Sequence, residues 1–211
     1  MAQTRVVTIS HATAAGGDNI GRGVAKGLGF RYVDEEIIQL AAGRHGVDAE
    51  VVADAERRKG LLDRILEDMA APPMMMEPTG GMTMLPREAF VTRDDVRALI
   101  VDAIKETADR GDVVIASHAA GIPLAGRRDV LRVLITASFE PRARRLAEAT
   151  RSTKADAEKS LKNSDAGRAD YFLRFYRIER ELPTHYDVVI NTDALAPDEA
   201  TDIVIAAARR H

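Results

Sequence analysis

The chain has 211 residues, of which 45% are hydrophobic and 30% charged, a composition typical of a globular protein and unlike that of a disordered chain. Lys and Arg number 30 against 33 Asp and Glu, so the net charge of −3 disfavours a general nucleic-acid binder. There is no cysteine, which excludes disulfides, thiolate metal sites and cysteine nucleophiles.

The length predicts a single domain across residues 1–211, since domains average about 150 residues. No apolar run approaches the roughly 18 residues of a membrane span. The first ten residues, MAQTRVVTIS, lack the apolar segment of a signal peptide. We therefore expect a cytoplasmic protein without a membrane or nucleic-acid partner.

The first predicted strand, residues 5–10, leads into the segment HATAAGGDNIGRG and then into an amphipathic helix. A strand, a tight glycine-containing turn and a helix together point backbone N–H groups at a phosphate. The usual phosphate-loop pattern, G-x-x-x-x-G-K-[ST], is not met. In one register Gly17 replaces the lysine and Asp18 the hydroxyl residue, whereas in a shifted register Arg22 replaces the lysine. The alternative is a close-packed turn whose glycines only permit packing.

Residues 71–90, APPMMMEPTGGMTMLPREAF, interrupt the regular pattern. Four prolines and the Gly80-Gly81 pair exclude a continuous helix or strand, and the segment holds five of the seven methionines. We interpret it either as a flexible lid or partner-binding loop, or as a disordered excursion or a segment tucked beneath a neighbouring subunit.

Three further strands are predicted at residues 112–116, 130–135 and 186–190. All four predicted strands are apolar throughout, as expected for parallel strands covered on both faces. Helical spacing of apolar residues predicts a helix over residues 92–109, and Pro197 suits the first position of a helix that runs to about residue 209. Strands alternating with helices predict a three-layer α/β fold, with a parallel sheet flanked by helices.

Positive charge is concentrated in residues 140–180, which hold 11 Lys and Arg against seven Asp and Glu. One interpretation is a solvated helical face with pairs four residues apart, such as Asp170 and Arg174. The other is a cluster arranged around a polyanionic small molecule such as a triphosphate.

Several segments together resemble the cytidylate kinase-like family of P-loop kinases. AAGGDNIG followed by LGFRYVDEEII resembles the family's Gly-Ser-Gly-Gly loop, Ile-Gly and Tyr-Asp pair. DVVIASHAAGIPLAGRRDVLRVLITASFEPRARRL is similar to its central strands, NSDAGRADYFLRFY to its lid segment, and HYDVVINTDALAPDEATDIV to its closing strand and helix. The resemblance covers nearly all of the chain outside the Met-rich segment. It implies a P-loop kinase-like fold with a helical lid at about residues 140–180, and transfer of the γ-phosphoryl group of ATP, with Mg²⁺, to CMP or a related nucleotide.

The resemblance also assigns roles to individual residues. The cofactor-binding loop that would surround the ATP phosphates comprises Ala14, Ala15, Gly16, Gly17, Asp18 and Asn19, with Arg22 as the nearest cation. Four arginines would contact phosphate oxygens as catalytic residues: Arg142, Arg145, Arg168 and Arg174. Asp18 would hold Mg²⁺, and Asp34 and His118 would lie at the phosphoryl acceptor. Asn191, Thr192 and Asp193 would end the last strand at the same sheet edge.

The family's loop often lacks the lysine, as this chain does at Gly17, so another cation must neutralise the phosphates. The family commonly has basic residues at two further positions, where this chain has Glu35 and His118. Three functions therefore stay open. The first is a working nucleoside monophosphate kinase, and the second is a nucleotide-binding or partner-binding module with impaired catalysis. The third is a kinase for another small acceptor, since Glu35 would suit a neutral or cationic one. The oligomeric state also stays open, with a homo-oligomer as one alternative. The five histidines are too dispersed for a zinc site, and no G-x-S-x-G hydrolase motif occurs.

Overall fold

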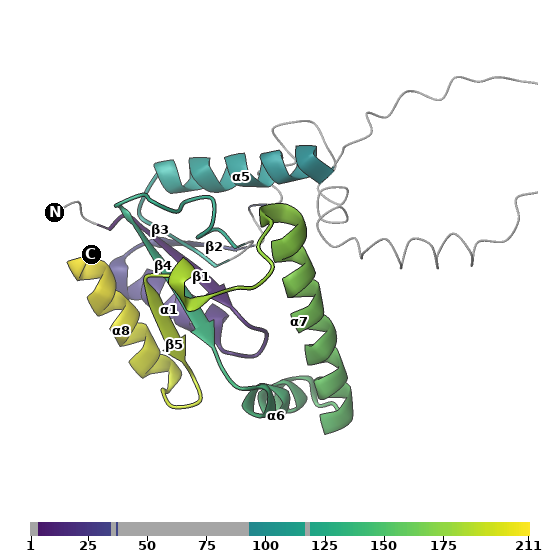
Figure 1. Cartoon of the computed structure of the whole chain (residues 1–211). Helices are drawn as coiled ribbons and strands as arrows, with labels where there is room; N and C mark the ends of the chain where they lie inside the picture. Colours follow the sequence, from purple (N-terminus) through teal and green to yellow (C-terminus); the bar gives the residue numbers. More distant parts are fainter. Residues whose placement is uncertain (1–3, 35–36, 38–92, 117–118) are drawn as a thin grey trace, which may run out of the picture.

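The computed structural model describes residues 4–34, 37, 93–116 and 119–211, so the Met-rich segment 71–90 lies outside the described residues (Figure 1). The strands are β1 (Val6–His11), β2 (Arg31–Val33), β3 (Val113–Ile115), β4 (Val130–Thr136) and β5 (Val188–Asn191). The α-helices are α1 (Gly17–Leu28), α5 (Arg93–Asp109), α6 (Phe139–Thr150), α7 (Lys154–Tyr176) and α8 (Pro197–Arg210), and Pro183–His185 form a 3₁₀ turn.

The five strands form one parallel sheet in the order β2-β3-β1-β4-β5, which confirms the predicted parallel sheet. β1 lies at the centre, paired with β3 on one side and β4 on the other. The chain builds β2 and β3 on one side of β1 before it crosses to β4 and β5, and ligands of open α/β sheets bind at such a switch of strand order. The carboxyl end of β1 is therefore the expected place for a site.

β2 was not among the four strands predicted from apolar runs. It has three residues: Arg31 is exposed, Tyr32 is half-buried and Val33 is buried. A strand this short has too few residues to show a periodicity. The other four strands lie within two residues of their predicted positions.

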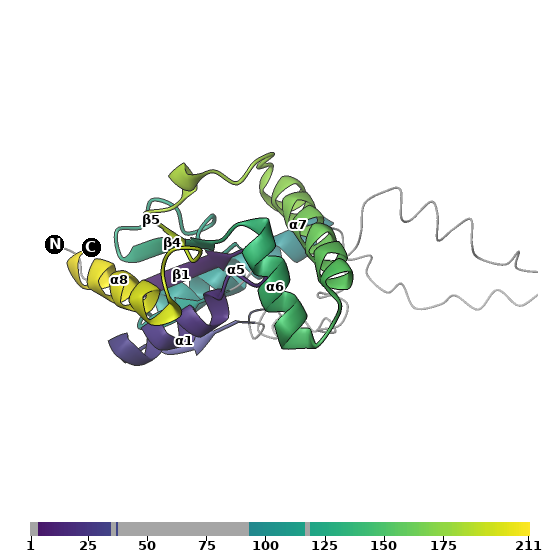
Figure 2. The same cartoon turned by 90° about the horizontal axis from the view of Figure 1, so that it is seen from below.

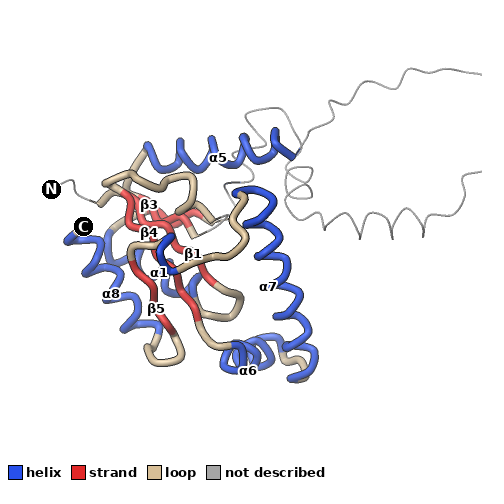
Figure 3. Tube along the Cα trace, viewed as in Figure 1, coloured by secondary structure: helices blue, strands red, loops and turns tan. Residues whose placement is uncertain are grey.

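Helices cover both faces of the sheet, so the fold has three layers (Figures 2 and 3). Successive residues of a strand point to opposite faces. Val6 of β1 accordingly packs into the core beneath α5, whereas Val7 and Ile9 pack into the core beneath α1 and α8. Burial on both faces explains why the strands are apolar throughout.

The helical lid predicted at residues 140–180 corresponds to α6 and α7, which pack against each other (Figure 1). Thr153 caps α7, since its hydroxyl accepts a hydrogen bond from the backbone N–H of Asp156 at 3.2 Å. Phe175, near the other end of α7, is buried in the core beneath α5. This contact attaches the lid helices to the sheet. In the ranges with described coordinates, no helix is both long enough and apolar enough to cross a bilayer.

Candidate functional site

The connection between β1 and α1 consists of residues 12–16, since β1 ends at His11 and α1 begins at Gly17. Gly16 has φ 87° and Ala14 has φ 62°, both in the left-handed region. This start of α1 corresponds to the first of the two registers considered for the phosphate loop, with Gly17 in the lysine position. In the shifted register the motif would end at Arg22, which lies within α1.

Two side chains flank the start of α1. Nε2 of His11 lies 3.2 Å from Oδ1 of Asp18, and the hydrogen bond from His11 holds the pKa of Asp18 below its ordinary value. Arg22 points elsewhere: its guanidinium carbon lies 4.4 Å from the ring centroid of Tyr32. Burial, together with the charges of Asp34 and Asp18, raises the pKa of Tyr32 to about 12.

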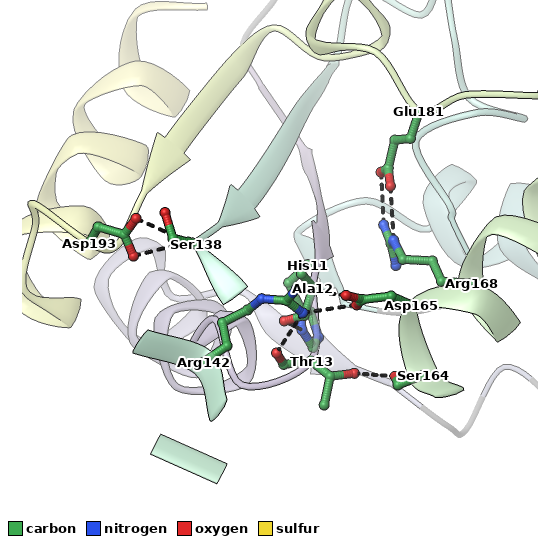
Figure 4. Close-up of polar contacts among 10 residues, drawn as sticks. All are labelled: His11, Ala12, Thr13, Ser138, Arg142, Ser164, Asp165, Arg168, Glu181 and Asp193. Carbon is green, nitrogen blue, oxygen red and sulfur yellow. Dashed lines mark hydrogen bonds and ion pairs between the residues drawn. The ribbon is translucent and has the colours of Figure 1, made fainter. Parts of the chain in front are cut away.

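Arg142, on α6, is held directly against the loop (Figure 4). Its terminal nitrogens donate to the two carboxylate oxygens of Asp165 on α7 at 2.9 and 2.7 Å, and one of them also donates to the carbonyl oxygen of Thr13 at 3.3 Å. The hydroxyl of Thr13 is hydrogen-bonded to that of Ser164 at 2.6 Å. Both lid helices are thereby attached to the loop.

Arg145 approaches the loop from its other side. Its two terminal nitrogens donate to the hydroxyl and the carbonyl oxygen of Thr192, just after β5, at 3.0 and 2.6 Å. The Thr192 hydroxyl in turn donates to the carbonyl oxygen of Ala15 at 2.9 Å. The loop conformation is therefore fixed partly through the carbonyl oxygens of Thr13 and Ala15. The N–H groups of Ala12 and Ala15 are also used within the fold, since they donate to the carbonyl oxygens of Ile135 and Ala12.

Arg168, on α7, reaches the carboxyl end of β1. Its guanidinium group forms a bidentate ion pair with Glu181, in which Nε and Nη2 donate to the two carboxylate oxygens at 2.9 and 2.8 Å. Nη2 also donates to the hydroxyl of Ser10 at 2.6 Å. Burial raises the pKa of Glu181, but hydrogen bonds from Arg168, Tyr186 and Ser10 lower it by more, so it lies below its ordinary value. Arg168 is thus positioned beside β1, where its guanidinium group is paired with the half-buried carboxylate of Glu181.

Arg174 differs from the other three arginines. Its Nε donates to Asp170, four residues earlier on α7, at 2.5 Å, and its guanidinium lies 5.7 Å from the ring of Phe175. This is the helical-face pair that the sequence predicted. The structure therefore brings Arg142 to the loop, Arg168 to the end of β1 and Arg145 to Thr192, which itself contacts the loop. The described contacts of Arg174 lie along its own helix.

A cavity of about 650 Å³ opens at this edge of the sheet, within the roughly 300–1,000 Å³ usual for ligand sites. One side of the cavity is formed by the end of β1, the loop and the first turn of α1. Further polar groups come from α6 and from the segment after β5, and the residues of this wall are His11, Ala14, Ala15, Gly16, Asp18, Asn19, Arg145, Thr192 and Asp193. Its apolar wall comes from α6 and the segment after β5, with Leu146, Ala149, Ala194, Leu195, Ala196 and Pro197. Most of the predicted loop residues line the cavity. Gly17, Arg22, Asp34 and the other three arginines do not, and His118 lies outside the described residues.

Sequence reasoning missed His11 and the aliphatic wall. Leu146, Ala149 and Leu195 are residue types found on any helix or loop, so no chemical signal singles them out. The strand-end position of Asn191, Thr192 and Asp193 did place that segment at the right edge. Asp193 serves there as an anchor, because both of its carboxylate oxygens accept from the backbone N–H of Ser138, at 3.1 and 3.0 Å (Figure 4).

Among the described residues, the carboxylates that line the cavity are those of Asp18 and Asp193, too few to hold a metal ion by protein groups alone. Mg²⁺ commonly takes one or two carboxylates and completes its shell with water and phosphate oxygens. Asp18 is a half-exposed carboxylate on the cavity wall. Within the described part of the chain, no group of three or more His, Cys, Asp or Glu is placed to hold a metal ion. The residues present therefore fit a metal that arrives with phosphates.

The central strand, glycine-containing loop, helix N-terminus and basic lid helices define a P-loop kinase fold. The structure resembles a shikimate kinase from Bacteroides thetaiotaomicron, with a TM-score of 0.53 and 13% identity over 96% of this chain and 97% of that chain. It also resembles an uncharacterized protein from Eubacterium ventriosum, with a TM-score of 0.67 and 15% identity over 99% of this chain and 100% of that chain. At these identities the likeness concerns the fold alone.

The cytidylate kinase-like family matches residues 6–194, and the chain belongs to that family. Over 105 residues it is 33% identical to the cytidylate kinase of Halobacterium salinarum, which covers 49% of this chain and 54% of that protein. The chain spans about half the length of the curated relatives it matches.

Proposed function

We propose that this protein is an ATP-dependent kinase that transfers the γ-phosphoryl group to CMP or a related nucleoside monophosphate. The observation that carries the proposal is the cavity in which the loop after β1, the N-terminus of α1 and Arg145 meet. Membership of the cytidylate kinase-like family supports it. A location in the cytoplasm is part of the same proposal.

The proposed roles follow from what phosphoryl transfer requires, which is positioned phosphates and cations where charge accumulates. Within residues 14–19, the backbone N–H groups other than that of Ala15, which donates to the carbonyl oxygen of Ala12, bind the phosphates of ATP, aided by the dipole of α1. Arg145 contacts phosphate oxygens from the cavity wall, while Arg142 and Arg168 add positive charge beside β1. Asp18 would hold Mg²⁺, which neutralises phosphate charge when bound.

The base of ATP is proposed to lie between the aliphatic side chains of α6 and those after β5. Leu146, Ala149 and Leu195 all line the cavity. The acceptor is proposed to bind at the opposite side of the loop, near Asp34 at the end of β2. Aliphatic side chains on two sides favour a flat base because both of its faces are removed from water. Selectivity for the nucleotide would then come from the polar groups that contact its phosphates.

A coupled assay for ADP formation across the common nucleoside monophosphates tests the proposal. We expect turnover with CMP or a close relative and a loss of turnover in Arg145→Ala, with Arg144→Ala as the matched control. Arg144 is an exposed neighbour on α6 that does not line the cavity. No ADP above background with any nucleoside monophosphate would overturn the proposal.

A second candidate is a nucleotide-binding module with impaired transfer. The contacts of Arg168 with Glu181 and of Arg174 with Asp170 favour it, since both guanidinium groups are engaged by carboxylates. Binding of ATP without turnover of any acceptor would support this candidate. Turnover restricted to non-nucleotide acceptors, screened in the same assay, would instead support a kinase for another small molecule.

A further inference from the structure

Arg145 differs from the other arginines of the candidate site in the charge of its partners. Each of the others is paired with a carboxylate, in the pairs Arg142–Asp165, Arg168–Glu181 and Arg174–Asp170. The described hydrogen bonds of Arg145 go to the hydroxyl and the carbonyl oxygen of Thr192, which carry no net charge. Asp193 lies nearby, but its carboxylate oxygens accept from the backbone N–H of Ser138. Among the described residues the charge of Arg145 is therefore not held in an ion pair, and it can serve an anion in the cavity.

Thr192 is held in place by the sheet. Its backbone N–H donates to the carbonyl oxygen of Thr136, the last residue of β4, at 2.9 Å, which continues the pairing of β4 with β5 by one residue. Thr192 also lines the cavity, although it is only 5% exposed. A residue fixed in this way gives the side chains that contact it a defined position.

The hydroxyl of Thr192 joins Arg145 to the phosphate loop. It accepts a hydrogen bond from Nη1 of Arg145 at 3.0 Å and donates to the carbonyl oxygen of Ala15 at 2.9 Å. The other acceptor within reach, the carbonyl oxygen of Thr136, is farther away at 3.4 Å. A hydroxyl suits this place because it accepts one hydrogen bond while it donates another. The bonds to Thr192 leave further N–H groups of the guanidinium, including that of Nε, to donate to a ligand.

We infer that Thr192 is a positioning residue for nucleotide binding: its hydroxyl fixes Arg145 against the phosphate loop, so that the arginine and the loop bind the phosphates of one nucleotide together. The inference rests on the proposed function, since it concerns the same cavity. An arginine side chain loses rotamer freedom when it binds a ligand, and a side chain that is already held in place loses less. Loss of the hydroxyl should therefore weaken binding through Arg145.

Thr192→Val tests this, because valine keeps the shape of the side chain and lacks the hydroxyl. Calorimetry with magnesium ATP measures the dissociation constant, at a temperature at which unfolding curves show each variant to be folded. We expect Thr192→Val to weaken ATP binding about three- to tenfold, the effect of one hydrogen bond. Thr192→Ser keeps the hydroxyl and should bind ATP within about twofold of the wild type.

A double-mutant cycle shows whether the hydroxyl acts through the arginine. Arg145→Ala should weaken ATP binding strongly in the wild type and by a smaller factor in Thr192→Val, because the valine variant has already lost the position of the guanidinium. The factor for the double variant T192V/R145A should therefore be smaller than the product of the two single factors.

Thr201→Val is the matched control. Thr201 lies on α8 and does not line the cavity, and its hydroxyl likewise donates to a main-chain carbonyl oxygen, that of Pro197, at 2.7 Å. This variant should bind ATP like the wild type. If Thr192→Val does not fold, a crystal structure of the wild type with magnesium ATP gives a second test. We expect Arg145 to contact a phosphate oxygen there while it keeps its hydrogen bonds to Thr192.

The outcomes separate the inference from the proposed function. Absence of ATP binding by the wild type would defeat both. Unchanged ATP binding in Thr192→Val, an equal loss in Thr201→Val, or single factors that simply multiply in the double variant would overturn the inference while the kinase proposal stands. An ATP complex in which Arg145 has left Thr192 would overturn it in the same way.

Discussion

Arg142 and Asp165 form a bidentate ion pair next to the loop that follows β1, with nitrogen–oxygen distances of 2.9 and 2.7 Å. The Arg142 side chain is only 8% exposed. One helix supplies the arginine and the next supplies the carboxylate, and the arginine also contacts the carbonyl oxygen of Thr13. The pair therefore joins both lid helices to the loop.

Asp165→Asn should destabilise the protein, because it leaves the buried charge of Arg142 without its counter-ion. We expect the free energy of unfolding to fall by about 1–3 kcal/mol, less than for a fully buried pair since Asp165 is 39% exposed. Urea denaturation measures the change. The control is Asp112→Asn at the exposed pair with Arg5, which should change stability by less than about 0.5 kcal/mol. Equal effects of the two substitutions would contradict the role given to Asp165.

Arg145→Ala should weaken ATP binding about tenfold or more, since it removes a cation from the cavity wall and releases Thr192. Calorimetry measures the dissociation constant. Arg144→Ala, the exposed neighbour, should leave it within about twofold. A variant of Arg145 that binds ATP like the wild type would place the phosphates elsewhere.

Gly16→Ala should cost about 1 kcal/mol of stability, because φ 87° is unfavourable for a residue with a Cβ although no atom lies within 4 Å of it. Gly167→Ala is the matched control. Gly167 lies within α7, also with nothing within 4 Å, so alanine there should stabilise by about 0.5–1 kcal/mol. Thermal and urea unfolding should give opposite signs for the two variants. A stabilising Gly16→Ala would show that the loop does not hold the left-handed conformation.

Most of the architecture could be predicted because strands that are buried on both faces appear in the sequence as continuous apolar runs. Val6 and Val7 point to opposite sides of the sheet and are both fully buried, so the whole strand must be apolar. β2 left no such signal, since only Val33 of its three residues is buried. The lid helices were expected from the resemblance to the family, and the pair of Asp170 and Arg174 was expected as a pair on one helical face.

The site was harder to predict, because its shape depends on contacts between distant segments. The sequence pattern after the first strand identified residues 14–19 as a candidate phosphate-binding loop. The hydrogen-bond partners of the arginines, however, come from distant parts of the chain. Thr192, which contacts Arg145, lies 47 residues away, and Glu181 holds Arg168 from a segment without a motif. The close approach of His11 to Gly17 depends on the path of the loop, which no spacing rule describes.

The stability of the protein should fall in acid partly through Glu181. Its pKa is lower in the folded protein than its ordinary value, so its contribution is complete above the unfolded pKa of about 4.3 and is lost as the pH falls through the folded pKa. The free energy of unfolding of the wild type should therefore drop between about pH 5 and pH 3. Glu181→Gln should be less stable at pH 7 and should lose less stability over that interval. Parallel pH profiles of the two proteins would refute this role.

The central claim is that the loop between β1 and α1 binds the phosphates of a nucleotide. The most direct measurement is an NMR titration of the wild-type protein with magnesium ATP, following backbone amide signals. We predict saturable shifts in residues 14–19 and in the segment after β5, with the amides of α5 unaffected. Amide signals of residues 14–19 that stay unchanged at millimolar ATP would contradict the claim.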